Sequence, residues 1–271
     1  MTLSINTNQG AMIALQQLNQ TNNMLEKTQL RITTGLKVNG PKDDASTYAI
    51  AQNMRGDIRG MEAVRTALAA GESTVNVAVE AGKAIADLLL DMKAKVVQAN
   101  QAGLDSASRT ALQNDFAALR DQIATIVTTA EFNGTNLIDG SASTFTVLST
   151  VEGSTITVSA QKMDTTSLTI QSASLLTSAN AASALTLIDT AIVSINDKLA
   201  ALGSAAKRLE VQSEFTIKLT DILKTGVGNL VDADMAEESA KLQALQIKQQ
   251  LGVQALSIAN QSPQSILSLF Q

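Results

Sequence analysis

The two ends of the chain share a pattern that few folds can accommodate: long helical periodicity with almost no charge. Their few charged residues are Glu26, Lys27 and Arg31 within residues 1–36, and Lys241 and Lys248 within residues 239–271. Gln, Asn, Ser and Ala take up most other positions, with Leu and Ile at helical spacing. A helix on the surface of a globular protein normally has a charged face toward water. Both ends are too polar for a membrane, so the pattern predicts helices that pack against other protein.

The C-terminal segment has more apolar surface than one partner can cover. On a helical wheel it has one uncharged polar stripe and two apolar arcs. The stripe is Gln243, Gln246, Gln250, Gln254, Ser257, Gln261 and Gln264. The first arc is Ala240, Ala244, Ile247, Leu251, Ala255 and Ile258, and the second is Leu245, Gly252, Leu256 and Ala259. Docking on one core needs about 100° of apolar surface, and this helix has roughly twice that. We therefore expect the second arc to be covered by another chain.

Composition argues against several classes of function. The chain has no Cys and no His, which removes thiol nucleophiles, imidazole bases and the common zinc ligands, so we expect neither an enzyme nor a cofactor. The formal net charge is −5, and there is no aromatic stacking platform, so nucleic acid is not an expected partner. We also expect no membrane partner and no secretory signal peptide, because no uncharged apolar run is long enough to span a bilayer and no basic n-region is present.

Four further runs of apolar residues at steps of three and four predict long helices in a bundle or coiled coil. The first run is Ala11, Leu15, Leu18, Asn22, Leu25, Gln29, Ile32 and Leu36, before a turn at residues 39–41. The second is Met61, Val64, Leu68, Gly71, Val75, Ala78, Gly82, Ile85, Leu89, Met92, Val96 and Ala99. The third follows a cap at Asp105 or Ser106 and ends near Ala130, and the fourth continues from Leu185 to a break at residues 226–228. Asp234 and Glu237 then form a capping box for the last helix.

Residues 132–180 have a different pattern. Phe145, Val147, Val151, Ile156, Val158, Leu168 and Ile170 partly alternate with Ser and Thr, and Gly-containing turns separate them, which predicts short hairpin strands. The expected fold is therefore mainly α, with paired terminal helices and a small β-hairpin region in mid-chain. The pattern divides the chain into terminal helical segments at residues 1–44 and 229–271, and a middle part made of residues 45–131, 132–180 and 181–228.

Motifs along the chain resemble the bacterial flagellins, particularly the short alphaproteobacterial type. The residues that carry this resemblance are Asn6, Asn8, Arg31, Gly35, Asp43, Asp44, Asn133, Gly134, Asn260, Gln261, Pro263 and Gln264. Their joint order and spacing is more specific than any single motif. Hook-associated junction proteins share the terminal pattern and are the alternative.

The resemblance implies a subunit that polymerises into the hollow filament of the flagellum, outside the cell. It also implies that residues 1–44 and 229–271 form an inner coiled coil, and that residues 45–131, 132–180 and 181–228 form an outer domain. The residues expected to pack the inner domain and the polymer are Leu15, Leu18, Leu25, Ile32, Leu242, Leu245, Ile247, Leu251, Gly252, Leu256, Ile258, Ala259, Ile266 and Leu269. The implied partners are further copies of the chain, the flagellar export apparatus and its chaperone, and the hook-associated and cap proteins. The stretch Met92–Gln98 lacks the Glu-Leu pair of flagellins that the innate immune receptor recognises, which implies weak or no recognition.

Several polar residues have more than one interpretation. Asn22 and Gln29 either fix helix register from inside the seam or face solvent. Asp43, Asp44, Asp232 and Asp234 fit caps and turns better than metal ligands, and the pair Glu237–Glu238 is expected to be a solvated first turn. The Ser/Thr-rich residues 141–178 either carry O-linked sugars or are simply soluble strand and turn residues.

Overall fold

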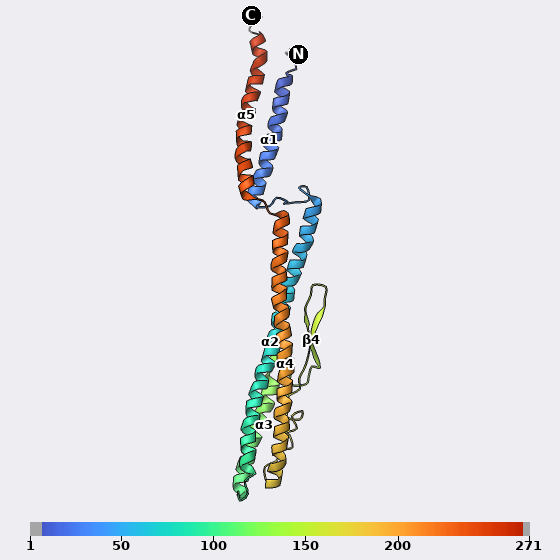
Figure 1. Ribbon diagram of the computed structural model, residues 1–271, viewed down its shortest axis with the longest axis vertical. Helices are drawn as coiled ribbons and strands as arrows, with labels where there is room; N and C mark the ends of the chain where they lie inside the picture. Colours follow the sequence, from blue (N-terminus) through green and yellow to red (C-terminus); the bar gives the residue numbers. More distant parts are fainter. Residues whose placement is uncertain (1–6, 268–271) are drawn as a thin grey trace. The chain divides into compact units, whose positions relative to one another are not determined.

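The computed structural model describes the backbone of residues 7–267 and the side chains of residues 7–261. The chain forms two compact units, which are described separately (Figure 1). The terminal unit contains residues 1–56 and 222–271, and the central unit contains residues 57–221.

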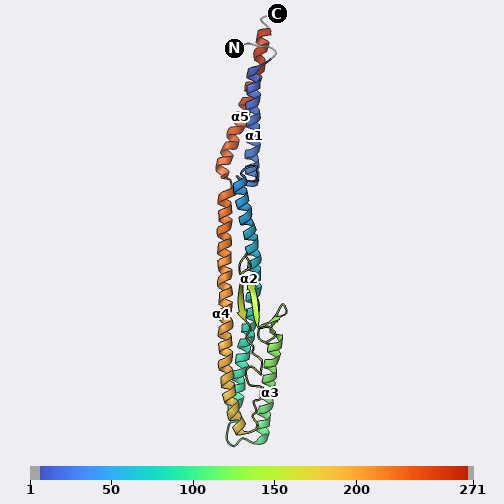
Figure 2. The ribbon, with the colours of Figure 1, turned by 90° about the vertical axis from the view of Figure 1, so that its right-hand side faces the viewer.

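In the terminal unit, α1 (Gln9–Thr34) and α5 (Met235–Leu267) lie side by side and run antiparallel (Figures 1 and 2). Asn8 begins α1 as its N-cap and accepts a hydrogen bond from the Ala11 N–H. Gly35 ends α1 with φ 71°, a left-handed conformation that a residue without Cβ adopts at little cost. Asp234 accepts hydrogen bonds from the N–H groups of Ala236 and Glu237, as expected for the cap of α5.

Two connections in the terminal unit pair with each other. The N–H groups of Lys37 and Val38 donate to the Val231 carbonyl at 2.7 and 3.2 Å. The Ala233 N–H donates to the Gly35 carbonyl at 2.9 Å. These hydrogen bonds hold residues 35–38, which follow α1, against the connection that precedes α5. Asp44 caps α2 (Ala45–Ala99) through the N–H groups of Ser46 and Thr47.

The break expected at residues 226–228 was wrong, because α4 (Ser178–Val231) continues through it. Glycine in a helix costs roughly 1 kcal/mol relative to alanine. Here Val227 and Val231 are buried, and burying a valine gains about 1.5–3 kcal/mol. Packing therefore outweighs propensity, and the helix ends only at Asp232–Asp234.

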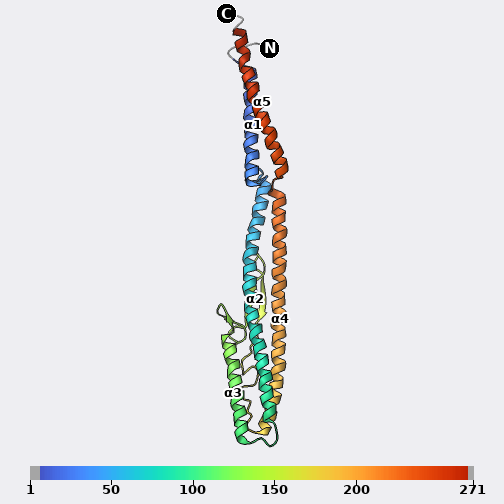
Figure 3. The same ribbon diagram turned by 90° about the vertical axis from the view of Figure 1, so that its left-hand side faces the viewer.

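The central unit packs α2, α3 (Ser106–Thr129) and α4 around an aliphatic core (Figure 3). The predicted second run is confirmed, since every member except Met61 is buried. Asp105 caps α3 by accepting from the Ser108 N–H, and its pKa is lowered by hydrogen bonds from Ser108. The side chain of Arg109 donates to the carbonyls of Ala99 and Gln101, which caps the end of α2.

The β region forms two separate antiparallel hairpins. One pairs β1 (Glu131–Phe132) with β2 (Thr135–Asn136), and the other pairs β3 (Thr144–Leu148) with β4 (Thr155–Ser159). Asn133 and Gly134 both have positive φ, 51° and 76°, as a tight hairpin turn requires. Val151, Leu168 and Ile170 lie outside the strands, so the expectation of strands there was wrong. Leu168 and Ile170 are instead buried core residues in a run of turns.

One helix in the described part of the chain, α4, is long and apolar enough to cross a membrane by length and composition, with a mean hydropathy of 1.3 over an 18-residue window. The expectation concerned uncharged runs, and Asp189 and Asp197 interrupt the apolar part of this helix. The same helix places Ile188, Ile195 and Leu202 in the core of the central unit. Its apolar character is therefore accounted for in part by packing against protein.

Gly71 allows the β3–β4 hairpin to approach α2. A Cβ at this position would lie 2.5 Å from a methyl carbon of Val147, which is itself buried. We predict that Gly71→Ala destabilises the chain, because the overpacking cost of about 1–3 kcal/mol exceeds the gain in helix propensity of about 1 kcal/mol. Urea unfolding measures the change.

Gly203→Ala is the matched control, since a Cβ on this exposed residue of α4 meets nothing within 4 Å. We expect it to raise the free energy of unfolding by about 0.5–1 kcal/mol. If Gly71→Ala is equally stabilising, the close contact with Val147 does not constrain the fold.

Candidate assembly surface

The seam between α1 and α5 is a regular antiparallel stripe, and it is not the one expected. The α1 residues that are at least half covered along it are Ala11, Ala14, Leu18, Thr21, Leu25, Thr28 and Ile32. The corresponding residues of α5 are Glu238, Leu242, Leu245, Gln249, Gly252, Leu256 and Ala259. Both lists step by three and four, as coiled-coil seams do.

Every second residue of the run predicted for α1 is wrong by one position, because the residue just before it faces α5 instead. Leu15, Asn22 and Gln29 are exposed, whereas Ala14, Thr21 and Thr28 face α5. The error arises because Leu15 is more apolar than Ala14 and was therefore preferred. Asn22 does not lie inside the seam, but its Oδ1 accepts a hydrogen bond of 2.8 Å from the Gln249 amide across the outside.

The two arcs of α5 have exchanged roles relative to the prediction. The second arc, which was expected to need another chain, packs on α1. A Cβ on Gly252 would lie 3.2 Å from a methyl carbon of Leu18. The first arc is the uncovered one, with Ile247 and Leu251 each 58% exposed and Ile258 69% exposed. The prediction that one arc is left uncovered holds for the described part of the chain, but the wrong arc was named.

The antiparallel pair of α1 and α5, called the terminal hairpin or simply the hairpin from here on, leaves all its described apolar side chains at least partly exposed. Among residues 9–34 and 235–261, the fully buried residues are Thr21, Thr28 and Glu238, and none of these is apolar. The large apolar residues that α1 exposes are Met12, Ile13, Leu15, Met24 and Leu30. Several of them line a shallow groove of about 490 Å³ with Gln9, Gln16 and Asn19.

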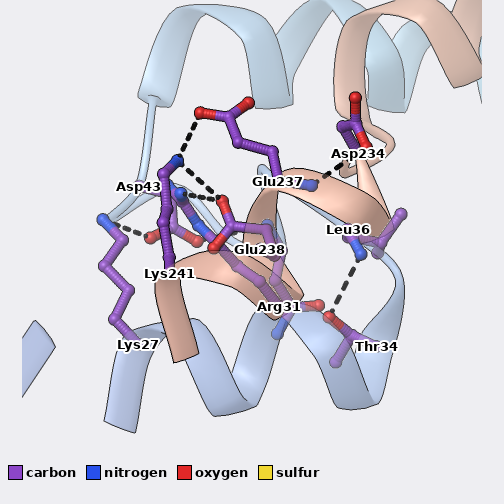
Figure 4. Close-up of polar contacts among 10 residues, drawn as sticks. Lys27, Arg31, Thr34, Leu36, Asp43, Asp234, Glu237, Glu238 and Lys241 are labelled. Carbon is purple, nitrogen blue, oxygen red and sulfur yellow. Dashed lines mark hydrogen bonds and ion pairs between the residues drawn. The ribbon is translucent and has the colours of Figure 1, made fainter. Parts of the chain in front are cut away.

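A group of ion pairs holds the base of the hairpin (Figure 4). Nη1 of Arg31 lies 2.9 Å from Oε1 of Glu238, and Lys241 bridges Glu237 at 2.8 Å and Glu238 at 3.4 Å. Lys27 lies 3.1 Å from Asp43, and this hydrogen bond lowers the pKa of Asp43. The expectation that Glu238 is solvated was wrong, because its side chain is only 6% exposed. The Arg31 charge compensates a carboxylate that would be costly to bury alone.

The flagellin-like positions mostly organise the ends of the hairpin and its connections. At the open end, the Asn8 amide donates to the Ala259 carbonyl at 2.7 Å, so one residue caps α1 and joins α5. At the base, Arg31 and Gly35 act as described above, and Asp43 also accepts from the Asn39 N–H. Asn260 and Gln261 are exposed. Pro263, Gln264 and Ile266 lie in α5 beyond the described side chains, and Asn6 and Leu269 lie outside the described residues.

A basic groove of about 300 Å³ opens on one flank of the hairpin. Its charged lining residues are Lys27, Arg31, Glu238, Lys241 and Lys248, and Met24, Thr28, Ala244 and Leu245 complete it. These four cations are all the Lys and Arg residues of α1 and α5. Sequence reasoning missed this grouping and the burial of Glu238. Extending the 4-3 spacing of α5 backward from Leu242 by four residues reaches Glu238, which was the available signal.

Comparisons with known proteins agree with this architecture. Residues 5–143 match the bacterial flagellin N-terminal helical region, and residues 185–270 match the bacterial flagellin C-terminal helical region. A putative flagellar hook-associated protein from Vibrio parahaemolyticus shares the fold, with a TM-score of 0.58 and 13% identity, over 70% of this chain and 100% of that chain.

Sequence relatives extend over the whole length of the chain. Flagellin FljK of Caulobacter vibrioides is 49% identical over 99% of this chain and 98% of its own. A flagellin of Brucella melitensis is 39% identical over 99% of both chains. The full-length identity and the two terminal matches show that this chain belongs to the bacterial flagellin family.

Proposed function

We propose that the uncovered faces of the α1–α5 hairpin are the surface through which copies of this chain polymerise into the flagellar filament. The observation that carries this proposal is the absence of any fully buried apolar side chain in the described part of either helix. Long helices in water owe most of their stability to a buried apolar face. Here that face is present in the sequence but is left open by the single chain.

The uncovered surface is large enough to drive association. Ile247, Leu251 and Ile258 are 58%, 58% and 69% exposed, so covering the remaining surface gains about 1–2 kcal/mol each, or roughly 3–6 kcal/mol together. Association costs at least about 4 kcal/mol in lost translational and rotational freedom. Burial of these three residues of α5 is therefore comparable to the lowest estimate of the association cost, even without the apolar residues of α1.

The surfaces on α1 and α5 differ, which favours an open-ended polymer. A contact between unlike surfaces repeats from copy to copy without closing unless the rotation forms a ring. On α1, the exposed apolar residues Met12, Ile13 and Leu15 line one groove with Gln9, Gln16 and Asn19. On α5, Ile247, Leu251 and Ile258 form an apolar arc beside the Gln stripe. Contact of one with the other fits a helical filament.

Flagellin-family membership favours a filament subunit over a hook-associated junction protein, because the full-length relatives are flagellins. It also favours a structural role over catalysis. By the same resemblance we propose that the chain is secreted through the flagellar export apparatus with the help of a chaperone, and that it meets hook-associated and cap proteins at the filament ends. The proposed filament layers are residues 1–44 with 229–271 inside, and residues 45–228 outside.

Replacing one exposed apolar residue should separate folding from assembly. We predict that Leu251→Gln leaves the unfolding of the monomer within about 0.5 kcal/mol of the original, because exposed substitutions change stability little. Polymerisation should fall sharply, since the lost burial recurs at every subunit. Sedimentation and electron microscopy measure assembly, and Leu251→Met is the control that keeps the apolar contact. Normal filaments from Leu251→Gln would contradict the role given to this arc.

The thin seam predicts that the terminal helices are loosely held in the isolated subunit. Ordering costs about 1–2 kcal/mol per residue for the backbone, and little apolar burial offsets it here. Trypsin should cut monomers near Lys27, Arg31, Lys241 and Lys248 and leave a resistant fragment from about residue 45 to residue 226. Filaments should resist at the same sites. Equal resistance in both forms would show that assembly does not stabilise the ends.

The absent Glu-Leu pair near residues 94–97 predicts weak activation of the flagellin receptor. Lys95 instead pairs with Asp115 at 2.7 Å, and Val97 is 52% exposed on α2. A reporter-cell dose response should lie well to the right of that of a strongly activating flagellin. Superimposable curves would contradict this expectation.

A further inference from the structure

The charges of the two terminal helices do not balance within one chain. Their seven charged residues are Glu26, Lys27, Arg31, Glu237, Glu238, Lys241 and Lys248. Lys27 pairs with Asp43, Arg31 pairs with Glu238, and Lys241 pairs with both glutamates of α5. Within the described part of the chain, Glu26 and Lys248 are the two members of this set without an ion pair. One is an anion and the other is a cation.

These two residues lie on opposite flanks of the hairpin. Lys248 lines the basic groove together with Met24, Lys27 and Arg31 of α1. Glu26 is absent from that lining and is exposed. At about 100° per residue, Glu26 projects roughly 160° away from Met24 and about 140° away from Arg31 around α1. The two charges therefore point away from each other, on different sides of the same pair of helices.

Along the axis of the helix pair, Glu26 and Lys248 are offset by only about one helical turn. Asn22 is hydrogen-bonded to Gln249, so Lys248 stands beside residues 22–23 of α1. Glu26 lies about one helical turn from that level, or roughly 5 Å along the axis. Two copies packed flank to flank with a stagger of about one turn would bring Glu26 of one copy to Lys248 of the next.

The groove itself is incomplete in the single chain. Arg31 and Glu238 are among its lining residues, and Nε of Arg31 and Oε2 of Glu238 are buried without a hydrogen-bond partner in the described part of the chain. Buried polar atoms in native proteins are nearly always paired. The groove also continues into the uncovered apolar surface, since Met24 is 49% exposed and Ala244 belongs to the first arc of α5. A second copy that covers this surface would cover the groove as well.

We propose that the basic groove is an intersubunit docking site, and that it receives Glu26 of a neighbouring copy, which pairs with Lys248. This inference rests on the proposed function and names a contact within it. The pairing is heterologous, because each copy offers Glu26 on one flank and Lys248 on the other. Such a contact propagates from copy to copy and fixes the axial stagger between neighbouring hairpins. Apolar packing alone, being non-directional, would not fix it.

Charge reversal tests the pairing. Glu26→Lys and Lys248→Glu should each raise the critical concentration for polymerisation by about tenfold, because like charges would meet at the interface. The double variant should return to within about threefold of the original protein. Glu26→Asp and Lys248→Arg are the matched controls and should assemble almost normally. Circular dichroism of the monomers should be the same for all variants, since both residues are exposed.

The design separates a local pair from an effect of total charge. The original net charge is −5, so Glu26→Lys makes it less negative by two and Lys248→Glu makes it more negative by two. An effect of total charge would move the two single variants in opposite directions. A direct pair weakens both and restores the double variant.

A zero-length carbodiimide cross-link gives the position of the contact. Filaments grown from a mixture of ¹⁴N- and ¹⁵N-labelled protein should yield a Glu26–Lys248 cross-link of mixed isotope composition, which monomers should lack. If the original protein forms filaments but both single reversals assemble normally, or if the double variant stays as poor as the singles, the pairing is overturned while the proposed function stands. If the original protein forms no filaments under any condition, the proposed function fails and the pairing fails with it.

Discussion

The antiparallel pairing of α1 and α5 is the interaction on which the terminal unit and its proposed assembly depend. It brings together residues more than 200 positions apart in the chain, as Arg31 with Glu238 and Asn8 with Ala259 show. Hydrogen bonds and ion pairs hold the two ends of the helix pair, and between them the seam combines Leu and Ile with small and polar residues. None of its described apolar side chains is fully covered, and Ile247, Leu251 and Ile258 lie outside it, so much aliphatic surface is left open by the single chain.

The two units differ in how far they cover their large apolar side chains. The central unit closes its own core, with Leu68, Ile85 and Leu89 of α2 all at 0% exposure in one cluster with residues of α3, α4 and the β-hairpins. The terminal unit leaves comparable residues, such as Leu251 and Ile258, more than half exposed. In a monomer this would be a liability, because contiguous apolar patches promote association. In a filament subunit, the same patches allow folding to be completed by assembly.

Much of the fold could be predicted from sequence, since the second run of apolar residues contained nearly all the buried positions of α2. Capping residues were also clear, and Asp44, Asp105 and Asp234 act as expected. The errors have a common physical cause. Hydrophobicity identified Leu15 as a seam residue, but tight approach selected Ala14 instead, and Gly252 against Leu18 was chosen over Leu251. Close packing favours small residues, and a single sequence does not show which face approaches most closely. The buried Glu238 was missed for a related reason, since its partner Arg31 lies 207 positions away.

The central claim is that the open face of the terminal hairpin is covered by other copies of the same chain. Electron cryo-microscopy of the assembled filament at side-chain resolution measures this directly, through the exposure of Ile247, Leu251 and Ile258. We expect each of them to become buried against α1 or α5 of a neighbouring subunit. If these side chains line the lumen or face solvent, and remain as exposed in the filament as in the single chain, the claim is contradicted.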